Sequence, residues 1–412
     1  MRIYYIRINE YYVAPGVKEF CSNFRYQGIA EIDKNVLFHR LFPGMKSPAI
    51  LVSAAVYRET GYGSSHPLAI PRIAPVLDLC EELNWLDKSN YSDSVQASFE
   101  QLTKFHLPEY IQAIRETEQT GRVSADHRKR FNFGTMENPF FPGLYRRAAT
   151  SVGGSIRAAE LASEGRVAYH PSGGTHHGMP GKASGFCYFN DVVFAILTLL
   201  EQGCERVLYV DLDAHHGDGV QAAFEEDKRV FTISVHEEGK WPFTGEIDDR
   251  GCGQARNMPV PAGFNDSELA YLMDEAVLPL GTGFVPDAVV ITLGADGLDG
   301  DPLSSMKLSN TGLWNAVDRL TGLAGATLVV GGGGYNPWLV ARCWTGLWAR
   351  LAGYAIPDTL PDAAQSILAK LECDLVDEDE VLPEWTMRMA DPLNEGPVRE
   401  QTKKIAATIL VP

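Results

Sequence analysis

Six short runs of apolar, largely β-branched residues alternate along the chain with segments of helical spacing. The runs are residues 49–54, 166–170, 206–211, 229–235, 287–294 and 326–332. The helical segments are residues 184–203, 267–281 and 311–324, the first of which closes on Gly203 as a helix end should. Strands that are apolar on both faces and alternate with helices are typical of a parallel sheet covered on both sides. We therefore expect an α/β fold with a central, mainly parallel sheet flanked by helices.

No repeat or low-complexity linker interrupts residues 49–355, so we expect a single domain there. Residues 1–44 contain many tyrosines and phenylalanines without a period. We interpret them as an N-terminal extension, dispensable for folding and catalysis, and Met45 as an alternative start of a domain spanning 45–412. From about residue 356 the chain combines a helix-like segment, 363–372, with the acidic residues 375–380, which indicates a helical tail.

The composition limits the partners and the location of the protein. Its 53 acidic and 36 basic residues give a net charge of −17, which argues against nucleic acid as the main partner. No apolar run reaches the roughly 20 residues of a membrane span, and the N-terminus lacks the apolar core of a signal peptide. The seven cysteines are scattered without a CxxC pair, as in a reduced protein. We expect a cytoplasmic protein, with its oligomeric state left open.

Polar and glycine-rich segments follow five of the six predicted strands. Two pairs of adjacent histidines, several aspartates and Tyr335 occur in residues 171–191, 211–219, 236–245, 295–302 and 331–337. In an open parallel sheet, the loops at the carboxyl ends of the strands form the binding site. These residues should therefore converge at the carboxyl ends of the strands. Their convergence indicates a binding site more specifically than any single motif does.

Asp213 and His215 are two residues apart at the end of a predicted strand, so their side chains should point to the same side. Together with Asp296, at the end of another strand, they offer three ligands to a zinc ion with an open position for water. Such a site would activate water and polarise a carbonyl group. An isolated aspartate at a strand end is more often a helix N-cap. The neighbouring histidines and carboxylates favour the metal site.

His176 and His177 follow a glycine-rich turn that lets the backbone approach a site closely. A metal hydrolase needs a base for the water proton and an acid for the leaving amine, and either imidazole could serve. Asp211 and Asp218, which flank the metal motif, are carboxylates that could fix the imidazole tautomers. The alternative is that one of the two histidines only packs.

The glycine-rich segment GGGGYN, residues 331–336, lacks the lysine of a P-loop and the pattern of a dinucleotide-binding turn. Four glycines allow a tight turn that could bring Tyr335 over the site. A phenol there could donate a hydrogen bond to a developing oxyanion. The alternative is a packed aromatic residue.

Residues 49–355 resemble the histone deacetylase superfamily, which includes bacterial acetoin-utilisation deacetylases and acetylpolyamine amidohydrolases. The resemblance is carried, in the family's order and spacing, by HPLAIPRI (66–73), GGTHHGMPGKASGFCYFND (173–191), VDLDAHHGDGVQAAF (210–224), LGADGLDGDPLS (293–304) and GGGGYN. It implies an arginase–deacetylase fold, one catalytic zinc ion per chain, and hydrolysis of an N-acetylated primary amine with release of acetate. The partner implied is an acetylated amine, either a protein lysine or a small molecule.

The resemblance also assigns roles to single residues. The zinc ligands correspond to Asp213, His215 and Asp296. The general acid/base corresponds to His177 with Asp218, its electrostatic helper to His176 with Asp211, and the residue that binds the scissile carbonyl to Tyr335. A structural potassium ion, bound partly through backbone oxygens, is implied at Asp211, Asp213, His215, Ser234 and Val235.

For the substrate, the resemblance implies a tunnel walled by Gly185 and Phe186, with Leu303 at its rim and Arg72 near where acetate leaves. Glu137 aligns with an aspartate that holds the substrate's backbone amides in related deacetylases. The loop 236–249 is shorter than in the family, which leaves open whether Trp241 or Phe243 lines the tunnel.

Acetyl-lysine side chains are the substrate that we expect, and three alternatives differ from this interpretation. An acetylpolyamine or other small-molecule deacetylase would use the same chemistry. A dimanganese ureohydrolase would share the fold, but it needs carboxylates for two metals where this chain offers paired histidines and GGGGYN. A non-catalytic acetyl-lysine binding module would be expected to lack a zinc ligand or Tyr335, and all of these residues are present.

Overall fold

The computed structural model describes residues 6–8, 11–13, 49–59, 61–64 and 66–411. The chain divides into two units between Lys46 and Ser47. In the first unit the described residues form two short strands, β1 (Ile6–Ile8) and β2 (Tyr11–Val13), which pair antiparallel. The alternative start at Met45 and most of the predicted extension lie outside the described residues, so the predicted dispensability of residues 1–44 stays a prediction.

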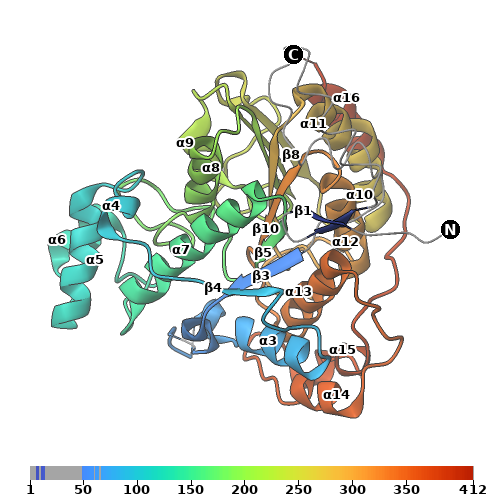
Figure 1. The fold of residues 1–412 in the computed structure, drawn as a ribbon, viewed down its shortest axis with the longest axis horizontal. Helices are drawn as coiled ribbons and strands as arrows, with labels where there is room; N and C mark the ends of the chain where they lie inside the picture. Colours follow the sequence, from blue (N-terminus) through green and yellow to red (C-terminus); the bar gives the residue numbers. More distant parts are fainter. Residues whose placement is uncertain (1–5, 9–10, 14–48, 60, 65, 412) are drawn as a thin grey trace. The chain divides into compact units, whose positions relative to one another are not determined.

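Within residues 49–411 the described chain forms one eight-stranded sheet in the order β4-β3-β5-β10-β9-β6-β7-β8. Figure 1 labels β4, β3, β5, β10 and β8 of this sheet. All neighbouring strands are parallel, which confirms the expected sheet. The six predicted runs form β3 (Ala49–Ser53), β5 (Val167–His170), β6 (Val207–Asp211), β7 (Val230–Glu237), β9 (Ala288–Thr292) and β10 (Ala326–Val330).

The two edge strands were not predicted, because neither carries an apolar run. Strand β4 (Tyr91–Asp93) has only three residues, and they are half-buried or exposed. Strand β8 (Ala255–Val260) contains an arginine, an asparagine and a proline. Proline is tolerated at an edge, where no further strand needs its missing N–H.

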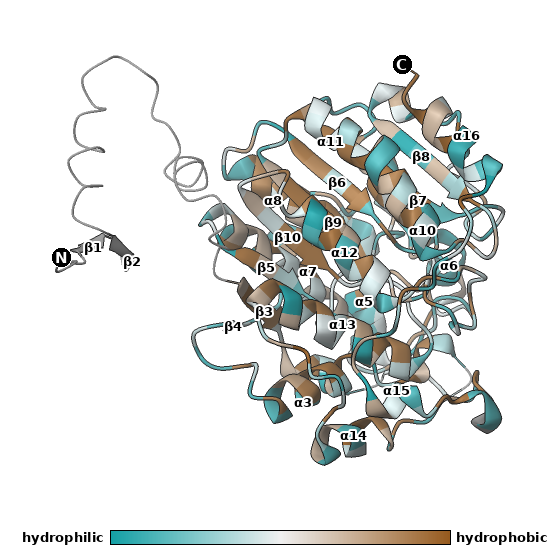
Figure 2. Ribbon diagram, turned by 90° about the vertical axis from the view of Figure 1, so that its right-hand side faces the viewer, coloured by the Kyte–Doolittle hydropathy of each residue, from teal (hydrophilic) through white to brown (hydrophobic). Residues whose placement is uncertain are grey.

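Successive side chains along each strand point to opposite faces of the sheet, and those of the two faces pack in two different hydrophobic cores. Ile50 and Val52 pack in one core with α7 (Leu144–Ser163), α8 (Asp191–Glu201) and α9 (Asp218–Phe224). Leu51 packs in the other core, with α3 (Ile73–Glu82), α10 (Asp266–Leu272), α12 (Asn310–Leu320), α13 (Pro337–Ala352) and α16 (Glu400–Ile409). Both faces of the sheet are therefore covered, and β6 and β10 are hydrophobic over much of their length (Figure 2).

The remaining described elements lie around these layers. Helices α4 (Phe99–Leu102), α5 (Pro108–Thr120) and α6 (Ala125–Phe131) lie beyond α7 in Figure 1, and they contribute to a third hydrophobic core. The short helical turns are η2 (Ala55–Arg58), η3 (Pro67–Ala69), η4 (Gly251–Gly253) and η6 (Glu378–Glu380).

Two of the predicted helices differ from the observed ones. In segment 184–203 the helix begins only at Asp191, where the Asn190 side chain caps it by accepting from the N–H of Val193 at 3.2 Å. Segment 267–281 continues from α10 through a π-helical stretch, η5 (Met273–Val277), into α11 (Leu278–Phe284). The π-helical stretch lies directly before Pro279, whose ring and missing N–H do not fit a regular α-helix.

The C-terminal residues pack against the domain through α14 (Asp362–Leu368), α15 (Glu384–Met387) and α16. Ile405 and Ile409 of α16 are buried in the core beside β8. The fully buried Arg342 of α13 pairs with Asp391 and donates from Nε to the carbonyl of Arg388 at 2.7 Å. No described helix is long and apolar enough to cross a membrane, and the cytoplasmic location stays a prediction.

We expect Asp391→Ala to lower the free energy of unfolding by about 3 kcal/mol, because it leaves the charge of Arg342 buried without its partner. Urea denaturation followed by circular dichroism measures the change. Asp374→Ala, which removes an exposed carboxylate from the same tail, is the control and should have little effect. Equal stability of the two variants would contradict a structural role for this ion pair.

Candidate active site

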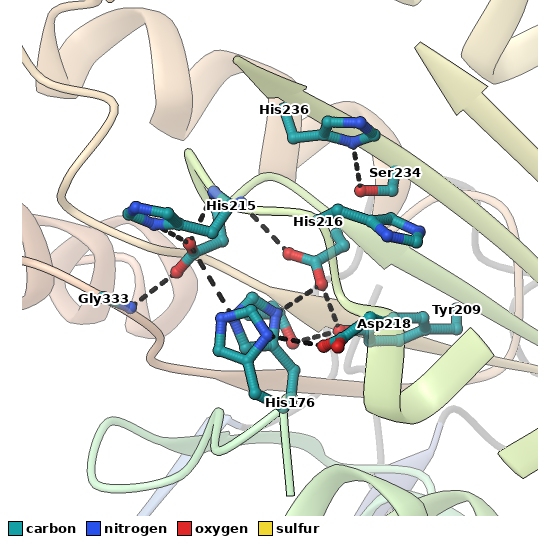
Figure 3. Close-up of polar contacts among 12 residues, drawn as sticks. His176, Tyr209, His215, His216, Asp218, Ser234, His236 and Gly333 are labelled. Atoms are coloured by element: carbon teal, nitrogen blue, oxygen red, sulfur yellow. Dashed lines mark hydrogen bonds and ion pairs between the residues drawn. The ribbon is translucent and has the colours of Figure 1, made fainter. Parts of the chain in front are cut away.

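The predicted metal ligands converge at the carboxyl ends of two central strands. Asp213 and His215 follow β6, and Asp296 follows β9. Figure 3 shows His215 near His176 and the backbone of Gly333. One ligand atom from each lies within 4.8 Å of the others. The Nδ1 atom of His215 is 2.9 Å from Oδ2 of Asp296 and 3.3 Å from Oδ1 of Asp213. Two carboxylate oxygens and one imidazole nitrogen therefore face a common point.

The two negative carboxylates at this point would be stabilised by a cation. Asp213 and Asp296 are fully buried, and burial together with the negative charge of Asp213 raises the pKa of Asp296. Their outer oxygens are held by backbone amides, since Gly333 N–H donates to Asp213 at 2.5 Å and Ala214 N–H donates to Asp296 at 3.1 Å. Two buried carboxylates with an imidazole are a donor set that zinc accepts. The residues present therefore fit a divalent metal ion.

The glycines of the segment 331–334 allow the backbone to approach these carboxylates. A Cβ atom on Gly333 would lie 2.0 Å from Oδ2 of Asp296, and one on Gly332 would lie 2.6 Å from Oδ2 of Asp213. Any larger residue at either position would push the carboxylates apart. The run of glycines thus serves the metal ligands as well as the turn that leads to Tyr335.

His177 is held as a neutral imidazole. Its Nδ1 lies 2.7 Å from Oδ1 of Asp218, and because a carboxylate only accepts, Nδ1 carries the hydrogen and Nε2 keeps its lone pair. Burial, together with the neighbouring charges of His176 and His215, lowers the pKa of His177 well below its usual value. The ring also lines the cavity of the site, so it can exchange a proton with a bound molecule.

His176 lies in the opposite electrostatic environment. Its Nδ1 is 2.7 Å from Oδ2 of Asp211, which also accepts from the Tyr209 hydroxyl at 2.6 Å. Burial opposes its protonation, but the charges of Asp211 and Asp213 outweigh burial and raise the pKa of His176 to about 9. The centroids of the His176 and His177 rings are 3.9 Å apart. One imidazole of the pair is therefore charged and the other neutral.

Asp191 supports the histidine pair, and sequence reasoning assigned it no role. This fully buried residue begins α8 and accepts from the N–H of Thr175 at 2.7 Å and of Gly174 at 3.1 Å. It thereby fixes the backbone directly before His176. The signal in the sequence was the end of the motif GGTHHGMPGKASGFCYFND, which was interpreted as a loop of the site and as part of a helix, with no role for Asp191 itself.

A cavity of about 130 Å³ adjoins the metal ligands and is lined by Arg72, His177, Gly185, Phe186 and Tyr335 among others. Burial, followed by the charges of Asp296 and Asp213, raises the pKa of Tyr335 well above its usual value, so its hydroxyl stays a donor. The guanidinium of Arg72 donates to the carbonyl of Gly332 and lies 4.8 Å from the centroid of the Trp344 ring.

Trp241, and not Phe243, is the aromatic residue of its loop that packs against the site. The Trp241 ring stands nearly perpendicular to that of His177, with centroids 4.6 Å apart. Phe243 is 73% exposed. Neither residue lines the cavity described above, so which of the two lines a substrate tunnel stays a prediction, and the packing against His177 favours Trp241.

The predicted rim residues lie outside the lining of the cavity. Leu303 is half-buried. The Glu137 carboxylate accepts from the N–H of Gly185 at 2.8 Å and from Nδ2 of Asn132 at 3.2 Å. Glu137 therefore holds one residue of the tunnel wall, and its contact with a substrate stays a prediction.

The residues of the predicted potassium site lie on adjacent strands. Asp211 and Ser234 are register partners on β6 and β7, and Asp213 and His215 follow β6 directly. The hydroxyl of Ser234 lies 2.8 Å from Nδ1 of His236 (Figure 3). The potassium ion itself stays a prediction.

Comparison with known proteins agrees with this geometry. The pattern of the histone deacetylase domain matches residues 66–351. The chain belongs to the histone deacetylase family. It is therefore a hydrolase of the deacetylase type, and the expected family resemblance is confirmed.

Individual relatives cover most of the chain. It is 37% identical over 308 residues to histone deacetylase clr6 of Schizosaccharomyces pombe, covering 73% of this chain and 76% of that protein. It is 32% identical over 320 residues to the acetoin utilization protein AcuC of Bacillus subtilis, covering 74% of this chain and 82% of that protein. The structure of a histone deacetylase homologue from Aquifex aeolicus superposes with a TM-score of 0.83 at 32% identity, covering 88% of this chain and 99% of that one. A homologue in complex with SAHA gives the same values.

We expect Gly185→Ala to lower kcat/KM for deacetylation by about tenfold or more, because small misplacements in an active site are costly. The added Cβ would lie 2.3 Å from the Trp241 ring and 2.7 Å from Cδ2 of His177. A steady-state assay measures the loss. Gly239→Ala is the matched control, since Gly239 has a similar positive φ of 71° but no atom within 4 Å of the added Cβ. Equal activity of both variants would contradict the close packing of Gly185.

Proposed function

We propose that the protein is a zinc-dependent amidohydrolase that removes the acetyl group from N-acetylated primary amines, with acetyl-lysine side chains as its substrates. The observation that carries this proposal is the convergence of the Asp213, His215 and Asp296 ligand atoms within 4.8 Å beside the histidine pair. Tyr335 lines the same cavity. This set combines a metal site, a neutral base, a charged imidazole and a hydrogen-bond donor.

Asp213, His215 and Asp296 would hold the zinc ion. When bound there, zinc would polarise the acetyl carbonyl and lower the pKa of water toward about 7. The remaining chemistry belongs to the side chains around it, and each has a fixed partner in the structure.

His177 is the residue that we propose moves the proton. Its Nε2 takes a proton as water attacks the carbonyl carbon, and it returns a proton to the amine nitrogen as the C–N bond breaks. Asp218 holds the ring in the required tautomer throughout, through the 2.7 Å hydrogen bond to Nδ1. The hydroxyl of Tyr335 donates to the oxyanion that develops on the carbonyl oxygen. His176, charged beside Asp211, adds positive potential next to the base.

The wall of the site favours an unbranched arm. Gly185 and Phe186 line the cavity, and Trp241 packs against His177, so the walls are apolar and close. A chain of methylene groups fits between such walls, and both a lysine side chain and a polyamine have one. We favour lysine because the relative clr6 is named a histone deacetylase. The unused lone pairs of Glu137 could accept from the backbone amides of a peptide.

We further propose that a potassium ion stabilises the loop that carries the zinc ligands. Asp211, Ser234 and Val235 lie on the paired strands β6 and β7, and Asp213 and His215 follow in the adjoining loop. Potassium is held by oxygen atoms, which this strand pair supplies from carboxylate, hydroxyl and carbonyl groups.

We expect one zinc ion per chain in the purified enzyme, measured by elemental analysis. Asp296→Ala should lose zinc and activity, because it removes one of three ligands. Asp299→Ala, which removes an exposed carboxylate three residues away, should keep both. Two equivalent metal ions per chain, or full activity of Asp296→Ala, would contradict a mononuclear zinc site.

A panel of acetyl-lysine peptides, acetylated polyamines and small acetylated amines tests the substrate, with acetate release as the readout. We expect the peptides to give the highest kcat/KM. Tyr335→Phe should keep its zinc and lose about 100-fold in kcat on every substrate, as for the removal of one oxyanion donor. A preference for polyamines over every peptide would overturn the lysine proposal. Unchanged turnover of Tyr335→Phe would make the tyrosine merely structural.

A further inference from the structure

A second buried carboxylate follows β9 beyond the predicted metal ligand Asp296, and the chemistry above does not use it. Asp301 is 5% exposed and lies in the loop between β9 and α12. Its Oδ2 accepts from the backbone N–H of Tyr335 at 2.7 Å, and its Oδ1 accepts from the N–H of Leu303 at 3.0 Å. A buried carboxylate is costly unless hydrogen bonds satisfy it, so these contacts fix where its oxygens lie.

Tyr335 needs such an anchor because of the residue that precedes it. Gly334 has a φ of +138°, a conformation that side-chain-bearing residues rarely adopt. Glycine restricts the following peptide only weakly, so the glycine-rich turn cannot by itself fix the direction of Tyr335. The N–H of Tyr335 donates to Asp301, whereas its carbonyl is approached by the weak thiol donor of Cys373 at 3.6 Å.

Two further hydrogen bonds join the same pair of loops. The N–H of Ala295 donates to the carbonyl of Gly333 at 2.8 Å. The side chain of Asn336 donates from Nδ2 to the carbonyl of Gly300 at 3.1 Å. These bonds lie on either side of Tyr335, and Asp301 supplies the bond to Tyr335 itself. The loop that carries Asp296 and Leu303 and the loop that carries Tyr335 are thus joined as one unit.

We propose that Asp301 is a positioning residue for the catalytic step: it fixes the backbone of Tyr335, and so the place of its hydroxyl, relative to the metal ligands and the loop of Leu303. This inference rests on the proposed function of Tyr335 as the oxyanion donor. Asp301 acts through Tyr335 and does not contact the substrate. Its loss should therefore lower kcat while leaving substrate binding and the metal ion in place.

The test compares Asp301→Asn with the matched control Asp299→Asn, in the wild-type background and in the Tyr335→Phe background. Asp301→Asn replaces one of the two acceptor oxygens by an amide NH2, so the side chain can no longer accept from the N–H groups of Tyr335 and Leu303 together, and the anchored geometry of the pair is lost. We expect kcat for a short acetyl-lysine peptide to fall by about tenfold or more, with KM changed by less than about twofold and zinc still at one per chain. Asp299 is exposed and pairs with Lys307, so Asp299→Asn should match the wild-type enzyme.

The double variant separates positioning from general damage. If Asp301 acts through the hydroxyl of Tyr335, Asp301→Asn should lower kcat by less than about twofold more in the Tyr335→Phe enzyme, because residues that act as a unit are not additive. Equal losses of kcat in both backgrounds, a raised KM alone, or full activity of Asp301→Asn would overturn the inference.

Failure of the proposed function would have a different signature. A wild-type enzyme that releases no acetate, or a Tyr335→Phe enzyme with full activity, would overturn both the function and the inference. Loss of activity in Tyr335→Phe together with full activity in Asp301→Asn would overturn the inference alone. If Asp301→Asn does not fold, Asp301→Glu replaces it in the test. This variant keeps both oxygens but displaces them by one methylene group, and it should give the same loss of kcat and the same non-additivity with Tyr335→Phe. Additive losses of kcat would again overturn the inference.

Discussion

Two fully buried carboxylates that face one another, Asp213 and Asp296, are the constraint on which the rest of the site depends. Like charges at this distance, away from water, are unfavourable without a compensating cation. The protein holds them with backbone N–H donors from Ala214 and Gly333, which orient the carboxylates but do not neutralise them. The divalent metal ion that we propose would resolve the conflict, and His215 would complete its ligand set. The structure therefore places two negative charges where they could bind a metal ion.

The parallel sheet explains how such distant residues meet. Every strand of the sheet runs in the same direction, so the segments that follow β5, β6, β9 and β10 all emerge at one edge. Those segments carry the histidine pair, the metal ligands and Tyr335. Two of these segments are then joined by the side chain of Asp301, which follows β9 and accepts from the N–H of Tyr335, which follows β10. The apolar faces of the strands are buried on both sides, which leaves the strand ends as the place for polar chemistry.

Much of this arrangement was predictable, because strand ends leave a pattern in the sequence. The spacing of Asp213 and His215 after an apolar run, and the separate strand before Asp296, predicted that their side chains would converge. The start of α8 was not predictable from spacing, because the apolar residues of 184–190 serve the active-site loop and continue the helical period. Which of Trp241 and Phe243 packs against His177 also required the structure, because the shortened loop has no hydrophobic period from which a side-chain direction could be predicted. Asp191 and Asp301 were missed for a third reason: their partners are backbone amides, and such hydrogen bonds leave no signature in side-chain identity.

The central claim is that a single zinc ion lies between Asp213, His215 and Asp296. Anomalous diffraction from crystals of the enzyme, recorded on both sides of the zinc absorption edge, tests it most directly. The account predicts one zinc peak per chain, in contact with these three side chains. Two adjacent metal peaks, or a zinc peak elsewhere with these three side chains in direct contact only with each other, would contradict it.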